Sequence, residues 1–394
     1  MLSRICDRWR AVLTISLLLL PALLQAQFAS PALGDGPFTL QTYQAKIEVE
    51  VIARGIPHPW SMAFLPDGDI LVTEREGNLR LIQDGRLNPE PIPGMPEVYT
   101  ERLLGLMEVL PHPEFNNNHR LYLTYHTLLS KEPKQVAFVL ASARYENQRI
   151  SDLKELLVTD TWDGAGGAAA RLAFGNDGKL YMGVGATRDD SAQQTDSLRG
   201  KILRLNDDGS VPADNPFVGQ RGYRPEIFTL GHRNPSGLTL HPETGELWEV
   251  EYGPNGGDEI NILRAGRNYG WPVVSFGRDY AGPYVSEVPY AEDMERPLST
   301  FIPGISPSGL AFYTGTDFPT WTTSAFVGAQ RVGQLPGTGR MVRIFYDENG
   351  NERQREDMLL ELGQRLRDIR MGPDRLMYLL TEEQDGALLA IKPS

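Results

Sequence analysis

The sequence predicts an all-β fold, a six-bladed β-propeller, and two observations support this prediction. The 394 residues include 40 glycines and 29 prolines, a share that favours many short elements joined by turns over long helices. A short β-rich core built on a Leu-Tyr-like pair also recurs six times along the chain. Six units that can each form about four strands are typical of a propeller. Because the copies are irregular, a pair of separate β-domains is the alternative.

The six repeated pairs follow one another at intervals of 51, 59, 67, 78 and 52 residues. They are Ile70-Leu71, Leu121-Tyr122, Leu180-Tyr181, Leu247-Trp248, Ala325-Phe326 and Met377-Tyr378. Turn sequences such as Pro66-Asp67-Gly68 and Asn176-Asp177-Gly178 precede some of them, and Gly or Asn/Asp there supplies the positive φ of a tight hairpin. Second strand signals follow at hairpin distance, as at 79–82 and 387–391.

Two other segments have local patterns of their own. Leu359, Leu362, Leu366 and Ile369 are spaced by 3, 4 and 3 residues, which predicts an amphipathic helix rather than a strand. The segment 347–351 is rich in Asp and Asn but has Glu352 where a calcium-binding EF-hand loop requires glycine. We expect a hairpin turn at 347–351.

Charge and cysteine content exclude several classes of protein. Acidic residues outnumber basic ones by 51 to 38, the formal net charge is -13, and no Lys/Arg-rich run occurs, so nucleic-acid binding is not expected. The single cysteine, Cys6, excludes a disulfide framework and a cysteine-based zinc site. Gly183-Val184-Gly185 lacks the third glycine of a dinucleotide-binding loop, so a nicotinamide cofactor is not expected.

The N-terminus is typical of a secretory signal peptide. Arg4, Arg8 and Arg10 precede the apolar run 11–24, and the small residue Ala26 follows it. The run is shorter than the roughly 20 apolar residues that span a bilayer, which disfavours the alternative of a membrane anchor. We expect a signal peptide at 1–26, an N-terminal extension at 27–44 and the propeller at 45–394. The protein would then be secreted, into the periplasm of a Gram-negative cell, with no membrane span after cleavage.

Five longer motifs occur in order along the chain. They are His-Pro-Trp-Ser-Met-Ala-Phe-Leu-Pro-Asp-Gly at 58–68, Gly-His-Arg-Asn-Pro-Ser-Gly-Leu at 231–238, Glu-Tyr-Gly-Pro-Asn-Gly-Gly-Asp-Glu-Ile-Asn at 251–261, Asn-Tyr-Gly-Trp-Pro at 268–272 and Arg-Leu-Arg-Asp at 365–368. With these motifs the chain resembles the glucose/sorbosone dehydrogenase family from about Ile56 to Ile391. These are soluble aldose dehydrogenases that use pyrroloquinoline quinone, and the resemblance also implies a six-bladed propeller.

The resemblance implies a set of cofactor-binding residues. Arg233, Asn234, Arg365 and Arg367 would contact the quinone, and Arg331 stands where the family usually has a cofactor-binding lysine. Arginine suits a cofactor with three carboxylates, because its planar guanidinium can donate two hydrogen bonds to one carboxylate. Arg365 and Arg367 would point to one face of an extended chain. The alternative for this pair is two solvated residues of a helix.

The segment 251–269 is rich in oxygen ligands and glycine, the chemistry that Ca²⁺ selects. By resemblance, the carbonyls of Gly253 and Pro254 would hold a calcium that bridges to the quinone. Glu259 and the carbonyl of Tyr269 would bind a second, structural calcium. The alternative is a glycine-rich turn with exposed acids.

The chain departs from the family at the catalytic base. The family histidine lies four residues before the Arg of an Arg-Leu-Ala-Phe-Gly strand, which here begins at Arg171, so Gly167 occupies its place. An active-site glutamine of the family aligns with Leu103. The nearest carboxylates in sequence are Asp163 and Glu101, and burial could raise the pKa of either into the range of a base. The six histidines, His58, His112, His119, His126, His232 and His241, favour structural roles.

These observations favour a quinone-dependent oxidoreductase that oxidises an aldose or related alcohol by hydride transfer and passes electrons to an external acceptor. The catalytic residue itself is left unassigned. One alternative is a non-catalytic propeller that binds a sugar or the cofactor. Another is a calcium-dependent lactonase, which has no need of the arginine cluster. Fold alone does not choose among them.

Overall fold

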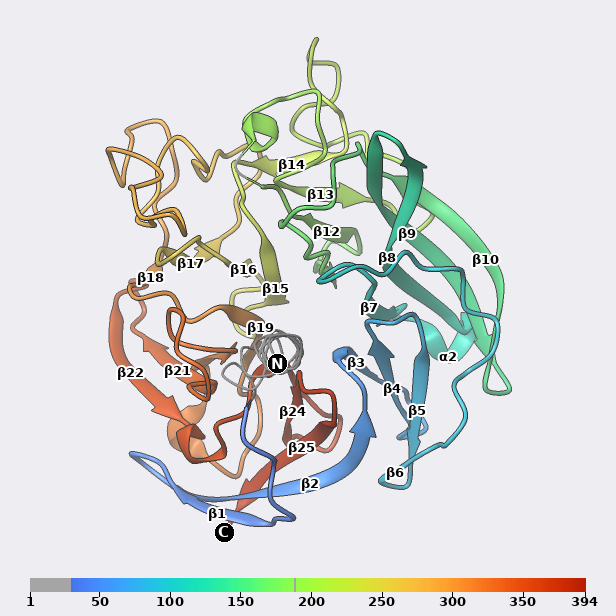
Figure 1. The fold of residues 1–394 in the computed structure, drawn as a ribbon, viewed down its shortest axis with the longest axis vertical. Coiled ribbons are helices and arrows are strands. Elements are labelled where there is room, and N and C mark those ends of the chain that lie inside the picture. Colours follow the sequence, from blue (N-terminus) through green and yellow to red (C-terminus); the bar gives the residue numbers. More distant parts are fainter. Residues whose placement is uncertain (1–29, 188) are drawn as a thin grey trace, which may run out of the picture.

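The computed structural model describes residues 30–187 and 189–394, and in this part of the chain the strands form six sheets around a central axis (Figure 1). The predicted six-bladed propeller is confirmed, and the alternative of two β-domains is wrong. The predicted signal peptide lies outside the described residues. Among the described helices, none is long and apolar enough to cross a membrane.

Each blade is an antiparallel meander whose first strand lies nearest the axis. The innermost strands are β3 (Pro59–Phe64), β7 (Leu106–Pro111), β11 (Leu172–Phe174), β15 (Pro235–Leu240), β19 (Pro307–Phe312) and β23 (Leu366–Met371). The second strands are β4 (Ile70–Glu74), β8 (Arg120–Lys131), β12 (Leu180–Val184), β16 (Leu247–Glu251), β20 (Ala325–Ala329) and β24 (Met377–Thr381). Each of the six repeated sequence pairs lies in one of these second strands, so the repeat reports the blade count correctly.

The outer half of each blade completes the sheet. The third strands are β5 (Leu79–Gln83), β9 (Lys134–Glu146), β13 (Lys201–Leu205), β17 (Asp258–Ile262), β21 (Arg340–Tyr346) and β25 (Gly386–Pro393). The outer strands are β6 (Arg86–Leu87), β10 (Arg149–Val158), β14 (Ile227–Leu230), β18 (Ser299–Phe301), β22 (Glu352–Met358) and β2 (Lys46–Ile56), with β1 (Phe38–Gln41) beyond β2. The short helices are α2 (Phe115–Asn118), η1 (Asp190–Ala192), η2 (Pro319–Trp321) and η3 (Leu360–Leu362).

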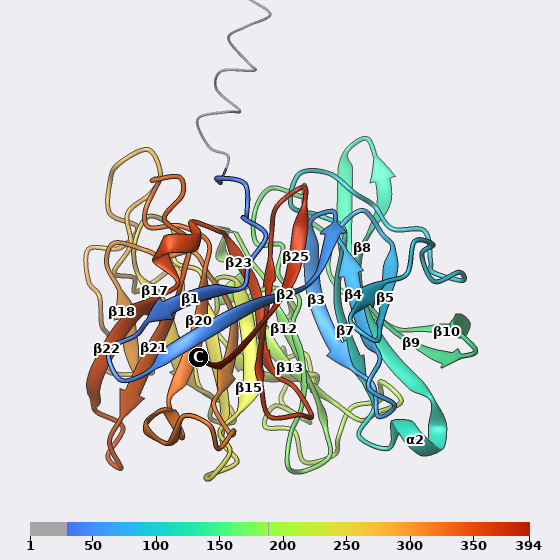
Figure 2. The same cartoon turned by 90° about the horizontal axis from the view of Figure 1, so that it is seen from below.

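The N-terminal strand β2 closes the ring. It pairs antiparallel with β25 near the C-terminus, and Ile47 faces Pro393 in the register (Figures 1 and 2). Ile47 and Val49 are fully buried in a core cluster shared with β20, β21, β23, β24 and β25. The sixth blade therefore takes strands from both ends of the described chain, and this pairing closes the ring.

Glycines let the innermost strands approach one another at the axis. The sequence Pro-Ser-Gly-Leu occurs in both β15 and β19. A Cβ added at Gly309 would lie 2.7 Å from the Ile369 nitrogen, and one at Gly237 would lie 2.8 Å from the Leu310 nitrogen. Any larger side chain would push neighbouring blades apart.

The helix predicted across 359–369 is wrong. The chain makes only the short η3, because Leu359 and Gly363 both have left-handed φ angles, of +63° and +60°, that interrupt a right-handed helix. Leu366 and Ile369 instead belong to β23 and are buried in the core. The hairpin turn predicted at 347–351 is confirmed: it joins β21 to β22, and Asp347 N donates to Asn351 O at 2.9 Å.

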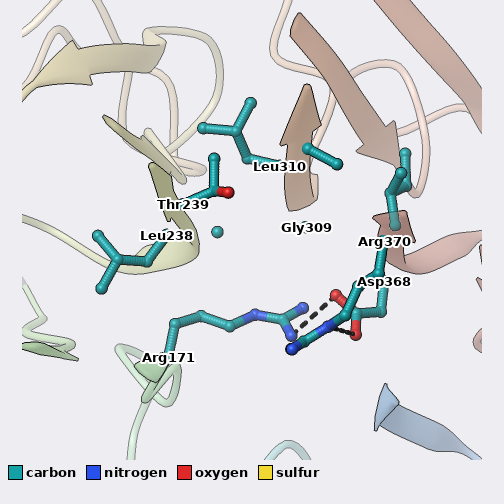
Figure 3. Close-up of a pocket in the computed structure, with 10 residues that line it drawn as sticks. Arg171, Leu238, Thr239, Gly309, Leu310, Asp368 and Arg370 are labelled. Carbon is teal, nitrogen blue, oxygen red and sulfur yellow. Dashed lines mark hydrogen bonds and ion pairs between the residues drawn. The ribbon is translucent and has the colours of Figure 1, made fainter. Parts of the chain in front are cut away.

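Four charges from three blades meet near the axis, and we call them the axial charge network: the buried Glu108, Arg171 and Asp368 and the partly buried Arg370. Arg171 Nη1 lies 3.2 Å from Glu108 Oε2 and 3.0 Å from Asp368 Oδ1, and Arg370 pairs with both carboxylates. Figure 3 shows the pairs that Asp368 makes with Arg171 and Arg370. A cavity of about 160 Å³ lies beside it, between Arg171, Gly237 and Gly309. The four charges balance, so the centre of the ring is neutral and cross-linked.

Candidate active site

A pocket of about 220 Å³ opens among the loops that connect the strands of the second, third and fourth blades. It brings together the Arg233 and Pro254 positions and the vacated base position Gly167, all singled out in the sequence. Its lining residues are Ala165, Gly166, Gly167, Thr187, Arg233, Pro254, Trp271, Asp279, Tyr280 and Val285.

Arg233 is held in place from both its main chain and its side chain. Its backbone nitrogen donates to Glu251 Oε2 at 2.6 Å, and Nη1 donates to the carbonyls of Tyr252 and Gly253, each at 3.0 Å. The guanidinium carbon lies 5.4 Å from the Trp271 ring centroid. Only Nη1 makes these side-chain bonds among the described residues, and Arg233 and the flat ring of Trp271 both line the pocket. This arrangement suits a planar anionic ligand.

Asn234 positions the neighbouring loop. Its Oδ1 accepts from the Ala169 backbone nitrogen at 2.9 Å, and its own backbone nitrogen donates to Glu251 Oε2 at 3.1 Å. The carboxylate of Glu251, which the sequence analysis left unassigned, therefore fixes the main chain of Arg233 and Asn234 together.

Arg365 and Arg367 both contact Glu382, a partner that the sequence analysis missed. Arg365 Nη2 lies 2.7 Å from Glu382 Oε2, and Arg367 Nη2 pairs with Glu382 Oε1. Burial opposes the ionisation of Glu382, but the charges of Arg367 and Arg365 outweigh it and lower its pKa to about 2. Glu382 brings the two arginines together, and their placement as solvated helix residues is wrong.

Two buried donors beside this cluster have no hydrogen-bond partner among the described residues. They are Arg367 Nε and Gln330 Nε2. Gln330 Oε1 accepts from Arg365 Nη2 at 2.6 Å, and Arg331, the next residue, is partly exposed. Burial raises the pKa of the Tyr252 phenol, and the nearby charges of Arg367 and Arg365 act in the opposite direction. The carbonyl of Tyr252 accepts a hydrogen bond from Arg233. Unpartnered donors next to several cations fit a carboxylate-rich ligand.

The segment proposed to hold calcium is folded tightly around Asp258. Gly253 N donates to Asp258 Oδ1 at 2.8 Å, while Ile305 N and Ser306 N donate to Oδ2 at 2.6 and 2.9 Å. Burial raises the pKa of Asp258 to about 7 despite these bonds. The Gly253 carbonyl turns toward Arg233, and Pro254 lines the pocket. This oxygen-only donor set beside the pocket fits Ca²⁺.

The two residues proposed for a second calcium lie in a buried cluster around His232. Glu259 stands opposite Glu251 in the β16–β17 register, and the Tyr269 ring stacks on His232 with centroids 4.6 Å apart. Burial lowers the pKa of His232 to about 4 and raises that of Glu249 to about 8, so the imidazole is neutral. The role predicted for His232 from sequence, a structural one, stays a prediction.

The vacated base position has no room for a side chain. Gly167 has a φ of +54°, and a Cβ there would lie 2.4 Å from the Ala186 carbonyl oxygen. Leu103, at the family glutamine position, is 55% exposed.

Neither of the two nearby carboxylates, Glu101 and Asp163, is buried. Burial is what would have raised the pKa of either one. Glu101 is exposed, and hydrogen bonds from Lys134 and then Tyr99 lower its pKa. Asp163 is exposed and accepts from the Ala165 backbone nitrogen at 2.9 Å. The expectation that burial converts one of them into a base is wrong.

Comparisons with known proteins agree with this geometry. The model of the glucose/sorbosone dehydrogenase family matches residues 56–390. The aldose sugar dehydrogenase of Escherichia coli is 35% identical over 358 residues, which are 89% of this chain and 94% of that protein. Quinoprotein glucose dehydrogenase B of Acinetobacter calcoaceticus is 32% identical over 289 residues, 64% of this chain and 58% of that protein. A crystal structure of glucose dehydrogenase superposes with a TM-score of 0.82 at 38% identity, covering 88% of this chain and 99% of that one. The chain belongs to the glucose/sorbosone dehydrogenase family of oxidoreductases.

Proposed function

We propose that this protein oxidises an aldose or a related alcohol by hydride transfer to pyrroloquinoline quinone, in the pocket between Arg233, Trp271 and Gly167. One observation supports this most directly. The pocket places a guanidinium, a flat indole and the site of the family base around one cavity of about 220 Å³. Two curated relatives are named as an aldose sugar dehydrogenase and a quinoprotein glucose dehydrogenase.

The chain's own residues would bind and orient the cofactor. Arg233 and Asn234 would hold it from one side, and Arg331, Arg365 and Arg367 from the other. Two of these arginines are kept extended by Glu382, which limits the entropy that they lose on binding. When bound, pyrroloquinoline quinone supplies the acceptor for a hydride, which carries the two electrons of the oxidation.

Calcium is part of this proposal. The carbonyls of Gly253 and Pro254 would hold one ion beside the pocket, where oxygen ligands suit Ca²⁺. Glu259 and the Tyr269 carbonyl would hold a second. We also propose export through the N-terminal signal peptide, cleavage near Ala26, and electron transfer to an external acceptor.

The base is the open question for turnover. Gly167 cannot carry an imidazole in this conformation, because its φ is +54° and a Cβ would meet the Ala186 carbonyl. This observation favours, as a second candidate, a propeller that binds cofactor or sugar without oxidising it.

Reconstitution separates the two candidates. The purified mature protein is mixed with pyrroloquinoline quinone and Ca²⁺, and dye reduction is followed with a panel of aldoses and simple alcohols. Dye bleaching that needs both quinone and sugar is expected. Tight quinone binding without turnover of any substrate would leave the binding protein as the function.

Two variants test the site itself. Arg233→Ala should abolish the visible absorbance of the bound quinone, because it removes the guanidinium that faces the pocket. Arg267→Ala is the matched control, since Arg267 is 61% exposed and pairs with Glu295 at the surface. Equal quinone binding by wild type and Arg233→Ala would contradict the assignment of this pocket.

A further inference from the structure

Behind Arg233, the buried cluster around His232 has the composition of a metal site with a nitrogen ligand. His232 lies in the loop between β14 and β15 and is fully buried. Glu249 and Glu251 alternate along β16, so they point to the same face of the sheet. Asn261 and Glu259 of β17 stand opposite them in the register and share that face.

Three ligand atoms converge in this cluster. His232 Nδ1 lies 3.1 Å from Glu249 Oε2 and 4.0 Å from Glu251 Oε1, and all three atoms lie within 4.8 Å of one another. Ligands bound tetrahedrally at the usual zinc distances are separated by about 3.4 Å. Small side-chain rotations would therefore place the three atoms around one ion.

Several atoms in the cluster have no hydrogen-bond partner among the described residues. They are His232 Nδ1, Glu249 Oε1 and Asn261 Oδ1, each fully enclosed by protein. The close approach of His232 Nδ1 to Glu249 thus lacks hydrogen-bond geometry. Ligands that point at a common ion approach one another in this way without bonding to each other.

The imidazole is oriented by contacts on its other side. His232 Nε2 and Thr229 Oγ1 lie 2.8 Å apart, and the Tyr269 ring covers one face of the imidazole. A histidine that binds a metal usually makes a hydrogen bond through its other ring nitrogen, which fixes the orientation of the imidazole. It leaves Nδ1 directed at the two carboxylates.

No lysine or arginine neutralises these acids within the described part of the chain. The only basic side chain there within 4.0 Å of the Glu249 and Glu251 carboxylates is His232, and its imidazole is neutral. The buried Lys201 is committed elsewhere, because its Nζ donates to the carbonyls of Ser191, Ala192 and Arg199 at 2.7, 3.1 and 2.7 Å. Buried carboxylates without a cation are costly, and a divalent ion would offset that cost.

We propose that His232 Nδ1, Glu249 and Glu251 bind a divalent first-row transition metal ion, with Zn²⁺ as its expected occupant. Imidazole nitrogen favours such an ion over Ca²⁺, which prefers six to eight oxygens. The site differs in ligands and metal from both calcium ions proposed above. Since the other oxygen of Glu251 accepts from the Arg233 and Asn234 amides, the ion would stiffen the main chain behind the pocket.

Metal analysis of the full-length exported protein, purified without chelators, tests the site without any need for activity. We expect about one zinc per chain by mass spectrometry. Co²⁺ supplied in place of Zn²⁺ should give a visible d–d absorption. The chelator 1,10-phenanthroline, which binds Zn²⁺ and not Ca²⁺, should lower the melting temperature, whereas its non-chelating 1,7 isomer should not.

The variant Glu249→Gln keeps the side-chain shape and removes one ligand charge. It should lose the zinc, the cobalt absorption and the response to 1,10-phenanthroline. Glu243→Gln, an exposed residue of the same β15–β16 hairpin, is the matched control and should retain all three.

Other outcomes overturn the proposal. If wild type contains no metal and Glu249→Gln melts at a higher temperature, the cluster is a set of protonated acids that the substitution relieves. If wild type contains calcium and ignores 1,10-phenanthroline, the assigned metal is wrong. Both wild-type measurements decide the matter even if the variant fails to fold.

Discussion

Gly167 stands at the position where the resemblance to the family leads one to expect the catalytic base. Its left-handed φ and the Ala186 carbonyl leave no volume for a Cβ. Gly185 reinforces the contact, because a Cβ there would lie 2.2 Å from the Gly167 carbonyl oxygen. A side chain at position 167 would therefore require a different loop conformation.

Substitution of Gly167 should lower the free energy of unfolding by more than its left-handed φ angle alone accounts for. We expect Gly167→Ala to lower the free energy of unfolding by about 3 kcal/mol or more, because a strained torsion and a clash add together. Gly55→Ala is the matched control: Gly55 has a φ of +76° with nothing within 4 Å of a Cβ, so about 1 kcal/mol is expected. Equal losses in urea denaturation would show that the loop yields to the side chain.

Glu382 should make stability sensitive to acid. Its folded-state pKa of about 2 lies below the unfolded value of about 4.3, so its contribution is full above about pH 4.3 and is lost as the pH falls toward 2. A shift of this size corresponds to about 3 kcal/mol.

Denaturation of Glu382→Gln between pH 5 and pH 2 measures this contribution. The variant should be less stable than wild type at neutral pH, since it leaves Arg365 and Arg367 uncompensated, and its stability should fall less on acidification. Glu361→Gln, at an exposed position, should follow the wild-type curve. Parallel curves for wild type and Glu382→Gln would contradict the assigned pKa.

At the scale of the element, β2 determines whether the ring closes. Its residues alternate between a buried face toward the core and a more exposed one, with Ile47 and Val49 fully buried and Lys46 exposed. The strand pairs with β25, which lies at the other end of the described chain. Local alternation is readable in the sequence, but the partner strand lies more than 300 residues away.

Truncation of a buried side chain in β2 should weaken the whole propeller. Ile47→Ala is expected to lower the free energy of unfolding by about 2–5 kcal/mol, because it leaves a cavity between the fifth and sixth blades. Lys46→Ala should change it by less than about 0.5 kcal/mol. A local loss of β2 without global unfolding, seen as hydrogen exchange confined to 46–56, would show that closure is not coupled to the remaining blades.

For the whole molecule, the axial charge network joins blades that are distant in sequence. Arg171 Nη1 contacts Glu108 and Asp368, its Nε donates to the Ser236 carbonyl at 2.8 Å, and its Nη2 donates to the Arg367 carbonyl at 3.0 Å. One guanidinium thus contacts three other strands around the axis, β7, β15 and β23. Since the network is buried, salt should screen it weakly.

Arg171→Met should lower the free energy of unfolding by about 3–5 kcal/mol, because it leaves two buried carboxylates with one arginine. The loss should be nearly the same at low and high salt. Arg144→Met is the surface control: Arg144 and Glu146 are 40% and 47% exposed, so less than about 1 kcal/mol is expected, falling with salt. A loss at Arg171 that salt abolishes would contradict a buried network.

The sequence by itself determined the number of blades and the closeness of two arginines of the proposed cofactor site. Each blade core is a local hairpin pattern, and the i, i+2 spacing of Arg365 and Arg367 places them together wherever that segment is extended. The misassigned helix at 359–369 shows the limit of such patterns, since its spacing fits a helix but left-handed torsions at Leu359 and Gly363 interrupt it.

Only the tertiary structure decided which charges meet. The pairing of Glu382 with two arginines, the convergence of His232 with Glu249, and the space closed to a side chain at Gly167 all depend on loops from different strands reaching one point. Sequence spacing carries no information on such distances, because each blade is placed by the packing of its neighbours around the ring. Burial within that ring then sets the pKa values, and with them the chemistry that these residues can perform.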